Sequence, residues 1–279
     1  MIIDCHTHFW QTAHWTEEAR TDALRVITNP ALLEIKPEEY WRAMETVDKA
    51  VVFGFAASHV GLAVPNDHVA RFVRSHPEKL IGFVAIDPLQ PGYLDELRHG
   101  IEDLKFRGVK LAPIYQNYHV MDERMLPVYE YCEKRGLPIL IHQGTTFFRD
   151  APLKYALPIQ LEDVAMRFRD LKMVIAHMGH PWIDETVVLI RKQPNLYSDV
   201  SALYYRPWQF YNALMSAVEY GAAHKLLFGS DYPFTTPAAS AEGIRKANHI
   251  TGQSGLPQVP AEVLEGIIER DTLGLLNLR

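Results

Sequence analysis

The segment PILIH, residues 138–142, is a short aliphatic run that ends in a histidine, and the chain contains a series of similar runs. Continuous apolar runs of this length are typical of strands that are buried on both faces, as in a parallel sheet covered by helices. We predict eight such strands, at Met1–His8, Ala50–Phe55, Leu80–Ile86, Gly108–Leu111, Pro138–His142, Lys172–His177, Leu196–Val200 and Leu226–Asp231.

Segments with helical patterns lie between these strands, and many of them open with a proline or an acidic first turn. Most strand starts are separated by roughly 20 to 35 residues, the length of one strand–loop–helix unit. The pattern predicts an α/β fold, a distorted (β/α)8 TIM barrel that residues 1–279 form as one domain. An open doubly wound sheet is the alternative, but no glycine-rich phosphate loop follows an early strand. The predicted helices are Tyr40–Asp48, His68–His76, Pro91–Lys105, Asp122–Arg135, Pro158–Asp170, Asp184–Lys192, Pro207–Gly221 and Pro237–His249.

Two segments exceed the regular barrel pattern. The gap between the first two strands is long, so Phe9–Lys36 is predicted to be an inserted loop or lid over the site. An extra C-terminal helix is predicted at Pro260–Leu276, where apolar residues recur at helical spacing.

Composition excludes several classes of protein. The net charge of −6 and a pI near 6.1 provide no basic surface for nucleic acid and no polybasic membrane anchor. Two cysteines, Cys5 and Cys132, cannot build a disulfide framework, and the N-terminal segment does not resemble a signal peptide. We therefore expect a cytoplasmic protein whose partner is a small-molecule substrate, not nucleic acid or a membrane, and which is either a monomer or a homodimer.

The first candidate site is the pair His6 and His8 at the end of the first predicted strand. Side chains two residues apart in a strand point the same way, and the C-terminal ends of barrel strands face the barrel mouth, where active sites are built. Two imidazoles placed in this way can hold one metal ion. The alternative is a pair of structural histidines with ordinary hydrogen bonds.

Three more strand ends carry groups of the same chemistry. His142, His177 and Asp231 each end an apolar run, so the barrel would bring them to the same rim as His6 and His8. Four imidazoles and a carboxylate converging on one rim would need extensive compensation if they bound nothing. The combination indicates a metal site.

These residues also carry a family resemblance. The motif Asp4-x-His6-x-His8, His142 after its Ile-rich strand, Ala176-His177-x-Gly179 and the segment Gly229–Pro233 together resemble the amidohydrolase superfamily. The branch that is most similar contains aminocarboxymuconate semialdehyde decarboxylase and related metal-dependent hydrolases. The resemblance extends over essentially the whole chain, and only the combination of motifs is specific.

The resemblance implies a TIM barrel with one divalent metal ion, zinc or alternatively manganese, held by His6, His8, His142 and Asp231. It also implies that His177 is the catalytic histidine beside a bound water. Asp231 could both touch the metal and accept a proton from that water. A metal lowers the pKa of its water toward neutrality and polarises a substrate oxygen.

Lys110, on the fourth predicted strand, has three interpretations. Other branches of the superfamily carry a carboxylated lysine on that strand, which bridges two metal ions; His142 and His177 would then hold the second ion. Lys110 could instead be a cation that binds a substrate carboxylate. The third interpretation is a lysine paired with a neighbouring acid.

Several polar and aromatic residues follow the strand ends and are candidates for binding substrate. Aromatic rings at these positions could sandwich a flat substrate, or they could only pack loops against the barrel. These candidates are Lys110, Gln116, His180, Trp182, Tyr232 and Trp10.

The leading functional hypothesis is a hydrolase that uses a metal-activated water on a small carbonyl substrate, such as a lactone, an amide or an ester. A non-oxidative decarboxylase of an unsaturated or aromatic carboxylic acid is the second hypothesis, because both reactions occur on similar sites in this branch. A third hypothesis is a catalytically inactive barrel that binds a metabolite. Such an inactive protein would be expected to lack one of the metal-site residues. All five are suitable in this chain: His6, His8, His142, His177 and Asp231.

Overall fold

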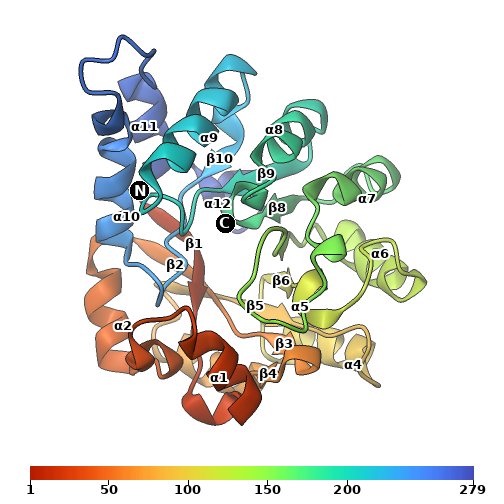
Figure 1. Ribbon diagram of the computed structural model, residues 1–279. Coiled ribbons are helices and arrows are strands. Elements are labelled where there is room, and N and C mark those ends of the chain that lie inside the picture. The colour runs from red at the N-terminus through yellow and green to blue at the C-terminus, as the bar shows by residue number, and fades with distance from the viewer.

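Eight parallel strands form a barrel with the helices around it in the computed structural model, which describes residues 1–279 (Figure 1). Their hydrogen-bonded order follows the chain, and each pair of neighbours in this order is parallel. The strands are β1 (Ile3–His8), β2 (Lys49–Phe53), β5 (Leu80–Ala85), β6 (Gly108–Leu111), β7 (Ile139–Ile141), β8 (Met173–Ile175), β9 (Leu196–Asp199) and β10 (Leu226–Leu227).

Backbone hydrogen bonds between β1 and the segment that follows β10 nearly close the barrel. The amide of Cys5 donates to the carbonyl of Phe228 at 3.0 Å, and the amide of Asp231 donates to the carbonyl of His6 at 2.8 Å. The amide of His8 donates to the carbonyl of Tyr232 at 2.8 Å. These contacts confirm the predicted TIM barrel.

A helix lies in each segment for which the sequence pattern predicted one, with ends that differ by up to seven residues, whereas the helices Glu17–Leu24 and Pro113–Gln116 were not predicted. The predicted helix Pro260–Leu276 is wrong in one respect. It is two short helices, because the side chain of Asp271 accepts a hydrogen bond from the amide of Gly274 and starts a new turn. The helices are α1 (Glu17–Leu24), α2 (Pro37–Ala43), α3 (Asn66–Ser75), α4 (Tyr93–Arg98), α5 (Pro113–Gln116), α6 (Leu126–Arg135), α7 (Leu161–Arg167), α8 (Ile183–Lys192), α9 (Pro207–Glu219), α10 (Pro237–Arg245), α11 (Ala261–Ile268) and α12 (Thr272–Leu275).

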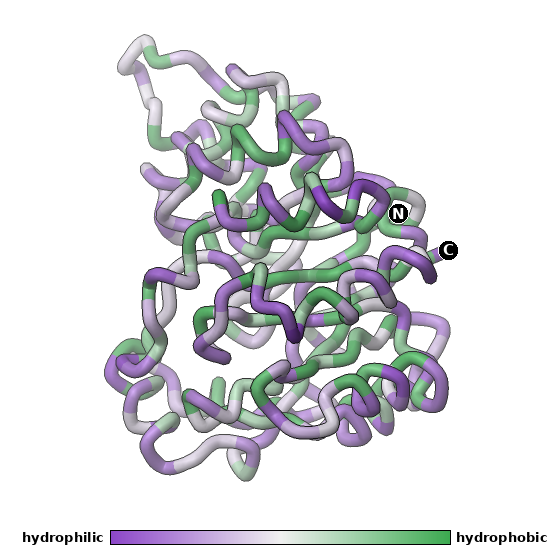
Figure 2. The backbone as a smooth tube through the Cα atoms, turned by 90° about the vertical axis from the view of Figure 1, so that its right-hand side faces the viewer, coloured by the Kyte–Doolittle hydropathy of each residue, from purple (hydrophilic) through white to green (hydrophobic).

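The apolar core has two parts that lie on opposite faces of the strands. In β2, Ala50 and Val52 belong to a large cluster that also contains helix residues, so they face outward. Val51 and Phe53 belong to a smaller cluster of 13 buried residues inside the barrel. That inner cluster also contains Leu273, Leu276 and Leu278 from the end of the chain, which close one end of the barrel. In Figure 2, hydrophobic stretches run through the middle of the molecule, while the outer helices alternate between hydrophobic and hydrophilic.

A register shift in β1 determines which of its side chains face inward. Ile3 and Cys5 belong to the inner cluster, and the rings of His6 and His8 both pack against the inward-facing Phe53. Two consecutive residues, Cys5 and His6, therefore face the same side. The pairing of β1 with β2 is irregular at this point, which is the effect of a β-bulge.

The segment Phe9–Lys36, predicted to be an insertion, contains α1 and two short 3₁₀ turns. The indole of Trp10 donates to the carbonyl of Leu32 at 2.9 Å, which ties the two ends of the segment together. A two-stranded antiparallel hairpin, β3 (Ala56–Ala57) with β4 (Leu62–Ala63), was not predicted; a bridge between Trp15 and Leu62 links it to the segment. The segment thus lies over the end of the barrel to which β1 and β2 lead.

None of the helices combines the length and the apolar character that crossing a lipid bilayer would require.

Candidate metal centre and active site

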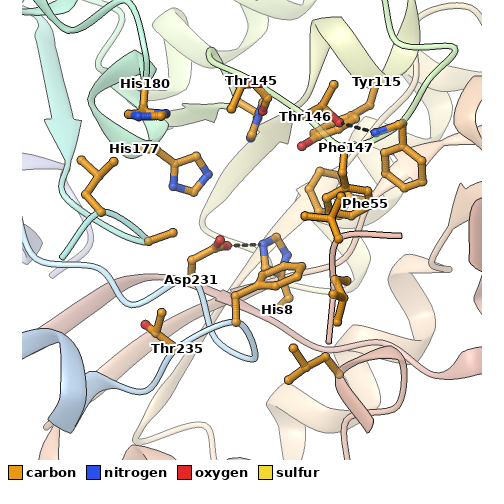
Figure 3. Close-up of a pocket in the computed structure, with 18 of the residues that line it drawn as sticks. His8, Phe55, Tyr115, Thr145, Thr146, Phe147, His177, His180, Asp231 and Thr235 are labelled. Atoms are coloured by element: carbon orange, nitrogen blue, oxygen red, sulfur yellow. Dashed lines mark hydrogen bonds and ion pairs between the residues drawn. The ribbon is translucent and has the colours of Figure 1, made fainter. Parts of the chain in front are cut away.

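A cavity of about 740 Å³ opens at the C-terminal ends of the strands, and 25 residues line it (Figure 3). Asp231 is the only acid in this lining, and Arg206 is the only lysine or arginine. His8, His142 and His177 also face the cavity. Much of the remaining wall is aromatic, with Trp10, Trp15, Phe55, Tyr115, Phe147, Phe148, Tyr204, Tyr205 and Phe234.

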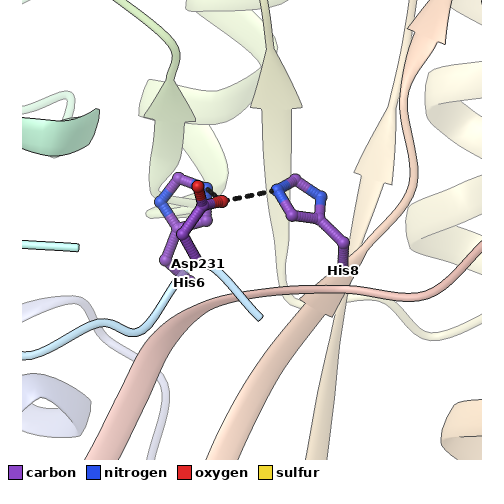
Figure 4. A group of neighbouring side chains, drawn as sticks. All are labelled: His6, His8 and Asp231. Atoms are coloured by element: carbon purple, nitrogen blue, oxygen red, sulfur yellow. Dashed lines mark hydrogen bonds and ion pairs between the residues drawn. The ribbon is translucent and has the colours of Figure 1, made fainter. Parts of the chain in front are cut away.

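His6, His8 and Asp231 bring three potential ligand atoms to one point at the floor of this cavity (Figure 4). Oδ1 of Asp231 lies 3.0 Å from Nε2 of His8 and 3.3 Å from Nε2 of His6. The two histidines come from β1, and Asp231 comes from the loop after β10, so the closure of the barrel creates the group. All three side chains are buried.

The chemistry of this group fits a divalent cation. Burial lowers the pKa of His6 to about 4 and that of His8 well below its ordinary value, so both rings are neutral and can act as ligands. Nε2 of His6, the nitrogen that faces Asp231, is buried and has no hydrogen-bond partner. Burial also raises the pKa of Asp231 well above its ordinary value, and the positive charge of Lys110 opposes this rise only in part. A metal ion would satisfy all three groups at once.

A second group of the same kind shares His6 and adds His177 and Asp199. Nδ1 of His6 lies 2.9 Å from Oδ2 of Asp199, a residue at the end of β9 that the sequence analysis did not select. The ring of His177 lies 4.8 Å from that of His6, centroid to centroid. Burial lowers the pKa of His177 to about 3, so its ring is neutral. His177 therefore stands directly beside the candidate metal group.

His142 lies at the same rim but slightly apart from the three converging ligands. Its ring centroid is 5.1 Å from that of His177, and its Nε2 lies 3.1 Å from the carbonyl of Thr145. Its pKa is well below the ordinary value, mainly because the ring is buried. The role of His142 as the fourth ligand stays a prediction.

Lys110 is enclosed in the barrel beneath the histidines. Its side chain is 1% exposed, and Nζ has no hydrogen-bond partner and no ion pair. Nζ lies 4.6 Å from the ring centroid of Phe53 and 5.4 Å from that of Phe55. Burial lowers the pKa of Lys110 to about 7, against the attraction of Asp231 and Asp199. The predicted pairing with a neighbouring acid is therefore wrong, and Lys110 does not line the cavity.

The other predicted substrate contacts divide into two groups. Trp10 and His180 line the cavity, and Nε2 of His180 is 2.7 Å from Oε1 of Gln209. Trp182 and Tyr232 do not line it; they pack against the apolar core. Sequence position near a strand end placed both groups in the same region but could not say which side chains point inward.

Gln116 does not line the cavity either, and its side chain is fully used in the fold. Its amide nitrogen donates to the carbonyls of Ala56 (2.6 Å) and Ile86 (2.5 Å), and its oxygen accepts from the amide of Ala112 at 3.0 Å. The predicted contact between Gln116 and substrate is not supported by this position. The residue instead ties the loops after three strands together.

Sequence reasoning missed Asp199, Ser201 and Arg206. Asp199 is the last residue of β9, but Ser198 interrupts the apolar residues before it and the predicted strand continued to Val200, so the signal that selected Asp231 was weaker for Asp199. No comparable signal marks Ser201 or Arg206, because both lie in the loop after β9 and acquire their surroundings only from the fold.

Comparison with known proteins finds one relative of this chain among curated sequences and several among solved structures. One curated relative is the 2-amino-3-carboxymuconate-6-semialdehyde decarboxylase of Dictyostelium discoideum, which is 25% identical over 223 residues. The match covers 68% of this chain and 62% of that protein, so it spans less than two thirds of the relative's length.

Solved structures share the fold over nearly their whole length. An uncharacterised TIM-barrel protein from Bordetella bronchiseptica superposes with a TM-score of 0.72 at 24% identity, covering 99% of this chain and 98% of its own. A dihydroxybenzoic acid decarboxylase from a Polaromonas species, with manganese and the inhibitor 2-nitroresorcinol bound, has a TM-score of 0.70 at 16% identity, covering 99% and 97%. A probable 2-pyrone-4,6-dicarboxylic acid hydrolase from Acinetobacter baumannii, with citric acid bound, has a TM-score of 0.67 at 18% identity, covering 99% of each chain.

The neighbours thus include both decarboxylases and hydrolases, and at these identities the likeness shows the fold alone. The family assignment has independent support, because residues 3–270 match the model of the amidohydrolase family. That range contains all four histidines and both carboxylates of the rim. The chain therefore belongs to the amidohydrolase family.

Proposed function

We propose that this protein is a metal-dependent, non-oxidative decarboxylase of an unsaturated or aromatic carboxylic acid. The observation that carries the proposal is the cavity itself: aromatic side chains form much of its wall, and His8 and Asp231 of the ligand group line its floor. Aromatic walls select a flat, conjugated molecule. The decarboxylase from Dictyostelium, which is named for an unsaturated carboxylic acid, supports the same class.

His6, His8 and Asp231 would hold the metal ion, with His142 as the candidate fourth ligand. When bound, a divalent cation would draw electron density from substrate oxygens and orient the reacting group. Manganese in the Polaromonas decarboxylase makes Mn²⁺ a reasonable first choice for loading, next to Zn²⁺.

In the proposed reaction the bond between the carboxylate carbon and the unsaturated carbon breaks. Its electron pair stays on the unsaturated carbon, which takes up one proton as carbon dioxide leaves. Asp231 is the candidate donor because it is the only acid in the cavity lining. Oδ1 of Asp231 faces His6 and His8, so we assign the proton to its other oxygen. His177, beside this group, would take up a solvent proton on Nε2 and pass it to Asp231 for the next turnover.

Arg206 supplies the charge that an anionic substrate needs at the cavity wall. Its Nη1 donates to the carbonyl of Ala202 at 2.7 Å, and its guanidinium lies 4.5 Å from the ring centroid of Tyr205. Arg206 has no ion pair in the protein, so its remaining N–H groups can bind a carboxylate.

Hydrolysis of a lactone, amide or ester is the second candidate. One observation favours it: Asp231 and His177, two groups that can move protons, both line the cavity. Asp231 would accept a proton from the attacking water, and Nε2 of His177 would take that proton from Asp231 and deliver it to the leaving group as the carbon–oxygen or carbon–nitrogen bond breaks. The same residues would therefore serve either reaction.

The deciding experiment assays enzyme loaded with Mn²⁺ or Zn²⁺ against two panels in D₂O. One panel contains hydroxylated benzoic acids and unsaturated dicarboxylic acids, and the other contains lactones, esters and amides. Carbon dioxide release with one deuterium on the former carboxylate-bearing carbon would support decarboxylation. Ring opening or ester and amide cleavage without carbon dioxide release would sink it in favour of hydrolysis.

Two variants accompany this assay. His177→Asn should lower turnover while metal content per chain stays at the parental level, because His177 lies beside the converging ligands and is not one of them. Arg206→Met should raise KM for carboxylic acids by roughly 10-fold or more, since one charge-assisted pair is lost. Unchanged KM in Arg206→Met would remove Arg206 from the substrate site.

A further inference from the structure

Asp199 lies between the two histidines to which the proposed function assigns different roles. Its carboxylate is fully buried at the end of β9 and does not line the cavity. Oδ2 lies 2.9 Å from Nδ1 of His6. Oδ1 accepts the amide of His177 at 2.9 Å, the amide of Ser201 at 3.0 Å and the hydroxyl of Ser201 at 2.5 Å. One carboxylate therefore contacts the candidate ligand, the backbone of His177 and a serine.

Ser201 continues this chain of contacts to the ring of His177. Its Oγ lies 2.8 Å from Nδ1 of His177, and its carbonyl oxygen lies 3.2 Å from the same nitrogen. Oγ is also 3.3 Å from Nδ1 of His6, but the shorter contact of that nitrogen is with Asp199. Ser201 is thus the only side chain bonded to the ring of His177.

The direction of each hydrogen bond follows from what each group can donate. An ionised carboxylate only accepts, so the hydroxyl of Ser201 donates to Asp199 and leaves its lone pair for His177. A carbonyl oxygen also only accepts, which again requires the hydrogen on Nδ1 of His177. Nδ1 of His6 likewise donates to Asp199. In both neutral rings the free lone pair is therefore on Nε2, which for His6 faces Asp231.

Asp199 also contacts the backbone of His177. His177 has a φ of 55° and the following Met178 a φ of 49°, a left-handed conformation that is uncommon for residues other than glycine. Ala202, which follows Ser201, has a φ of 54°. The two amides that Oδ1 of Asp199 accepts belong to these two unusual turns, so the carboxylate supports both the backbone and the ring of His177.

We propose that Asp199 and Ser201 are positioning residues: Asp199 sets the tautomer and orientation of both His6 and His177, and Ser201 transmits its effect to the ring of His177. The inference rests on the proposed function for the roles of the two histidines. Hydrogen-bond partners outside the first layer of ligands orient metal-binding imidazoles in this manner and raise their basicity. Asp199 would thereby couple metal affinity to proton transfer through one carboxylate.

The variants separate the two branches of this network. Ser201→Ala removes the hydroxyl that links Asp199 to the ring of His177, whereas Ser201→Thr keeps a hydroxyl and should preserve that link. Asp199→Asn disturbs the contacts to both His6 and His177, because an amide nitrogen donates where the carboxylate oxygen accepted. Ser198→Ala is the matched control: Ser198 is a buried serine of β9 whose hydroxyl donates to the carbonyl of Ile175 and contacts neither histidine. Circular dichroism checks that each variant is folded.

Two readouts need no substrate. Affinity for Zn²⁺ is measured by competition with a chromophoric chelator, and the tautomers of His6 and His177 are read from ¹⁵N shifts in histidine-labelled, Zn²⁺-loaded protein. Asp199→Asn should weaken Zn²⁺ binding by about 10- to 100-fold. Ser201→Ala should change it by less than about 3-fold and should weaken the Nδ1–H preference of His177 only, because the backbone carbonyl at position 201 still accepts from Nδ1 while the closer hydroxyl is gone. Ser201→Thr and Ser198→Ala should retain the parental affinity and both tautomers.

Equal loss of Zn²⁺ affinity in Asp199→Asn and Ser198→Ala would overturn the proposal, because it would reduce Asp199 to a general structural residue. An unchanged His177 tautomer in Ser201→Ala would likewise overturn the role of Ser201. With a substrate in hand, kcat of Ser201→Ala should fall about 10- to 100-fold with little change in KM. Failure to find carbon dioxide release would count against the proposed reaction only, since the tautomers and Zn²⁺ affinities do not depend on it.

Discussion

The two ends of this barrel are made from the same strands but hold opposite chemistry. At the closed end, Leu273, Leu276 and Leu278 belong to the apolar cluster inside the barrel. At the open end, His6 and His8 present buried nitrogens without hydrogen-bond partners. The closed end therefore stabilises the fold, whereas the unpartnered buried nitrogens at the open end lower its stability but remain available to bind a ligand.

The boundary between the two ends lies inside β1. Ile3 and Cys5 belong to the apolar interior, and the irregular pairing after Asp4 turns His6 and His8 to the same side as these residues. Without this bulge, strict alternation would send His6 and His8 outward whenever Cys5 faced inward. A one-residue irregularity in a six-residue strand thus supplies two side chains of the metal group.

The largest effect should come from removing a ligand at the open end. His8→Ala should reduce bound metal from near one ion per chain to less than about a tenth, and kcat/KM by about 10³-fold or more, because one of three converging ligands is lost. Metal analysis after dialysis measures the first quantity. His249→Ala, at an exposed histidine, is the control and should keep its metal. Full metal content in His8→Ala would contradict the assignment of the metal site to the open end of the barrel.

The corresponding change at the closed end should do the reverse. Leu276→Ala should lower the free energy of unfolding by about 2 to 5 kcal/mol, because a leucine that is 1% exposed leaves a cavity inside the barrel. Metal content and KM should stay at parental values. Urea denaturation gives the free energy, and Leu256→Ala, at an exposed leucine, should change it by less than about 0.5 kcal/mol. If Leu276→Ala lost metal while remaining folded, the two ends would not be independent.

Removing the metal should show how much the empty metal site at the open end lowers the stability of the fold. Stripping the enzyme with a chelator should lower the melting temperature, and adding Zn²⁺ or Mn²⁺ at 100 times its Kd should restore about 2.7 kcal/mol. Differential scanning calorimetry follows the change. The His8→Ala variant should show little response to the same additions, and an equal response would place the stabilising ion elsewhere on the protein.

A smaller effect is expected at Gln116 and should show whether this rim residue stabilises the fold or binds substrate. Gln116→Leu should cost about 1 to 3 kcal/mol of stability, because the backbone groups of Ala56, Ile86 and Ala112 lose their partner. KM should not change, since Gln116 does not face the cavity. The control is Gln258→Leu, at an exposed glutamine far along the chain from the strand ends. A raised KM with unchanged stability would return Gln116 to the substrate site.

Much of the site could be predicted because its residues end apolar runs. His142 follows β7 directly, and His177 and Asp231 lie within four residues of the ends of β8 and β10; parallel strands in a barrel deliver their C-terminal ends to one rim. Asp199 was overlooked because the polar Ser198 precedes it and the predicted strand ran on to Val200. Gln116, Trp182 and Tyr232 were predicted together with the cavity residues but do not line the cavity, because proximity to a strand end does not determine the direction of a loop side chain.

The sequence by itself determined the eight-strand order, the insertion Phe9–Lys36 and the set of imidazoles and carboxylates at the strand ends, because apolar periodicity and strand termini are local properties. Only the tertiary structure decided that β1 contains a bulge and that Asp231 meets His6 and His8. It also decided that Asp199 joins His6 to His177 through Ser201. These contacts join residues up to 225 positions apart, from His6 to Asp231, and no local pattern specifies the closure of a barrel that brings them together.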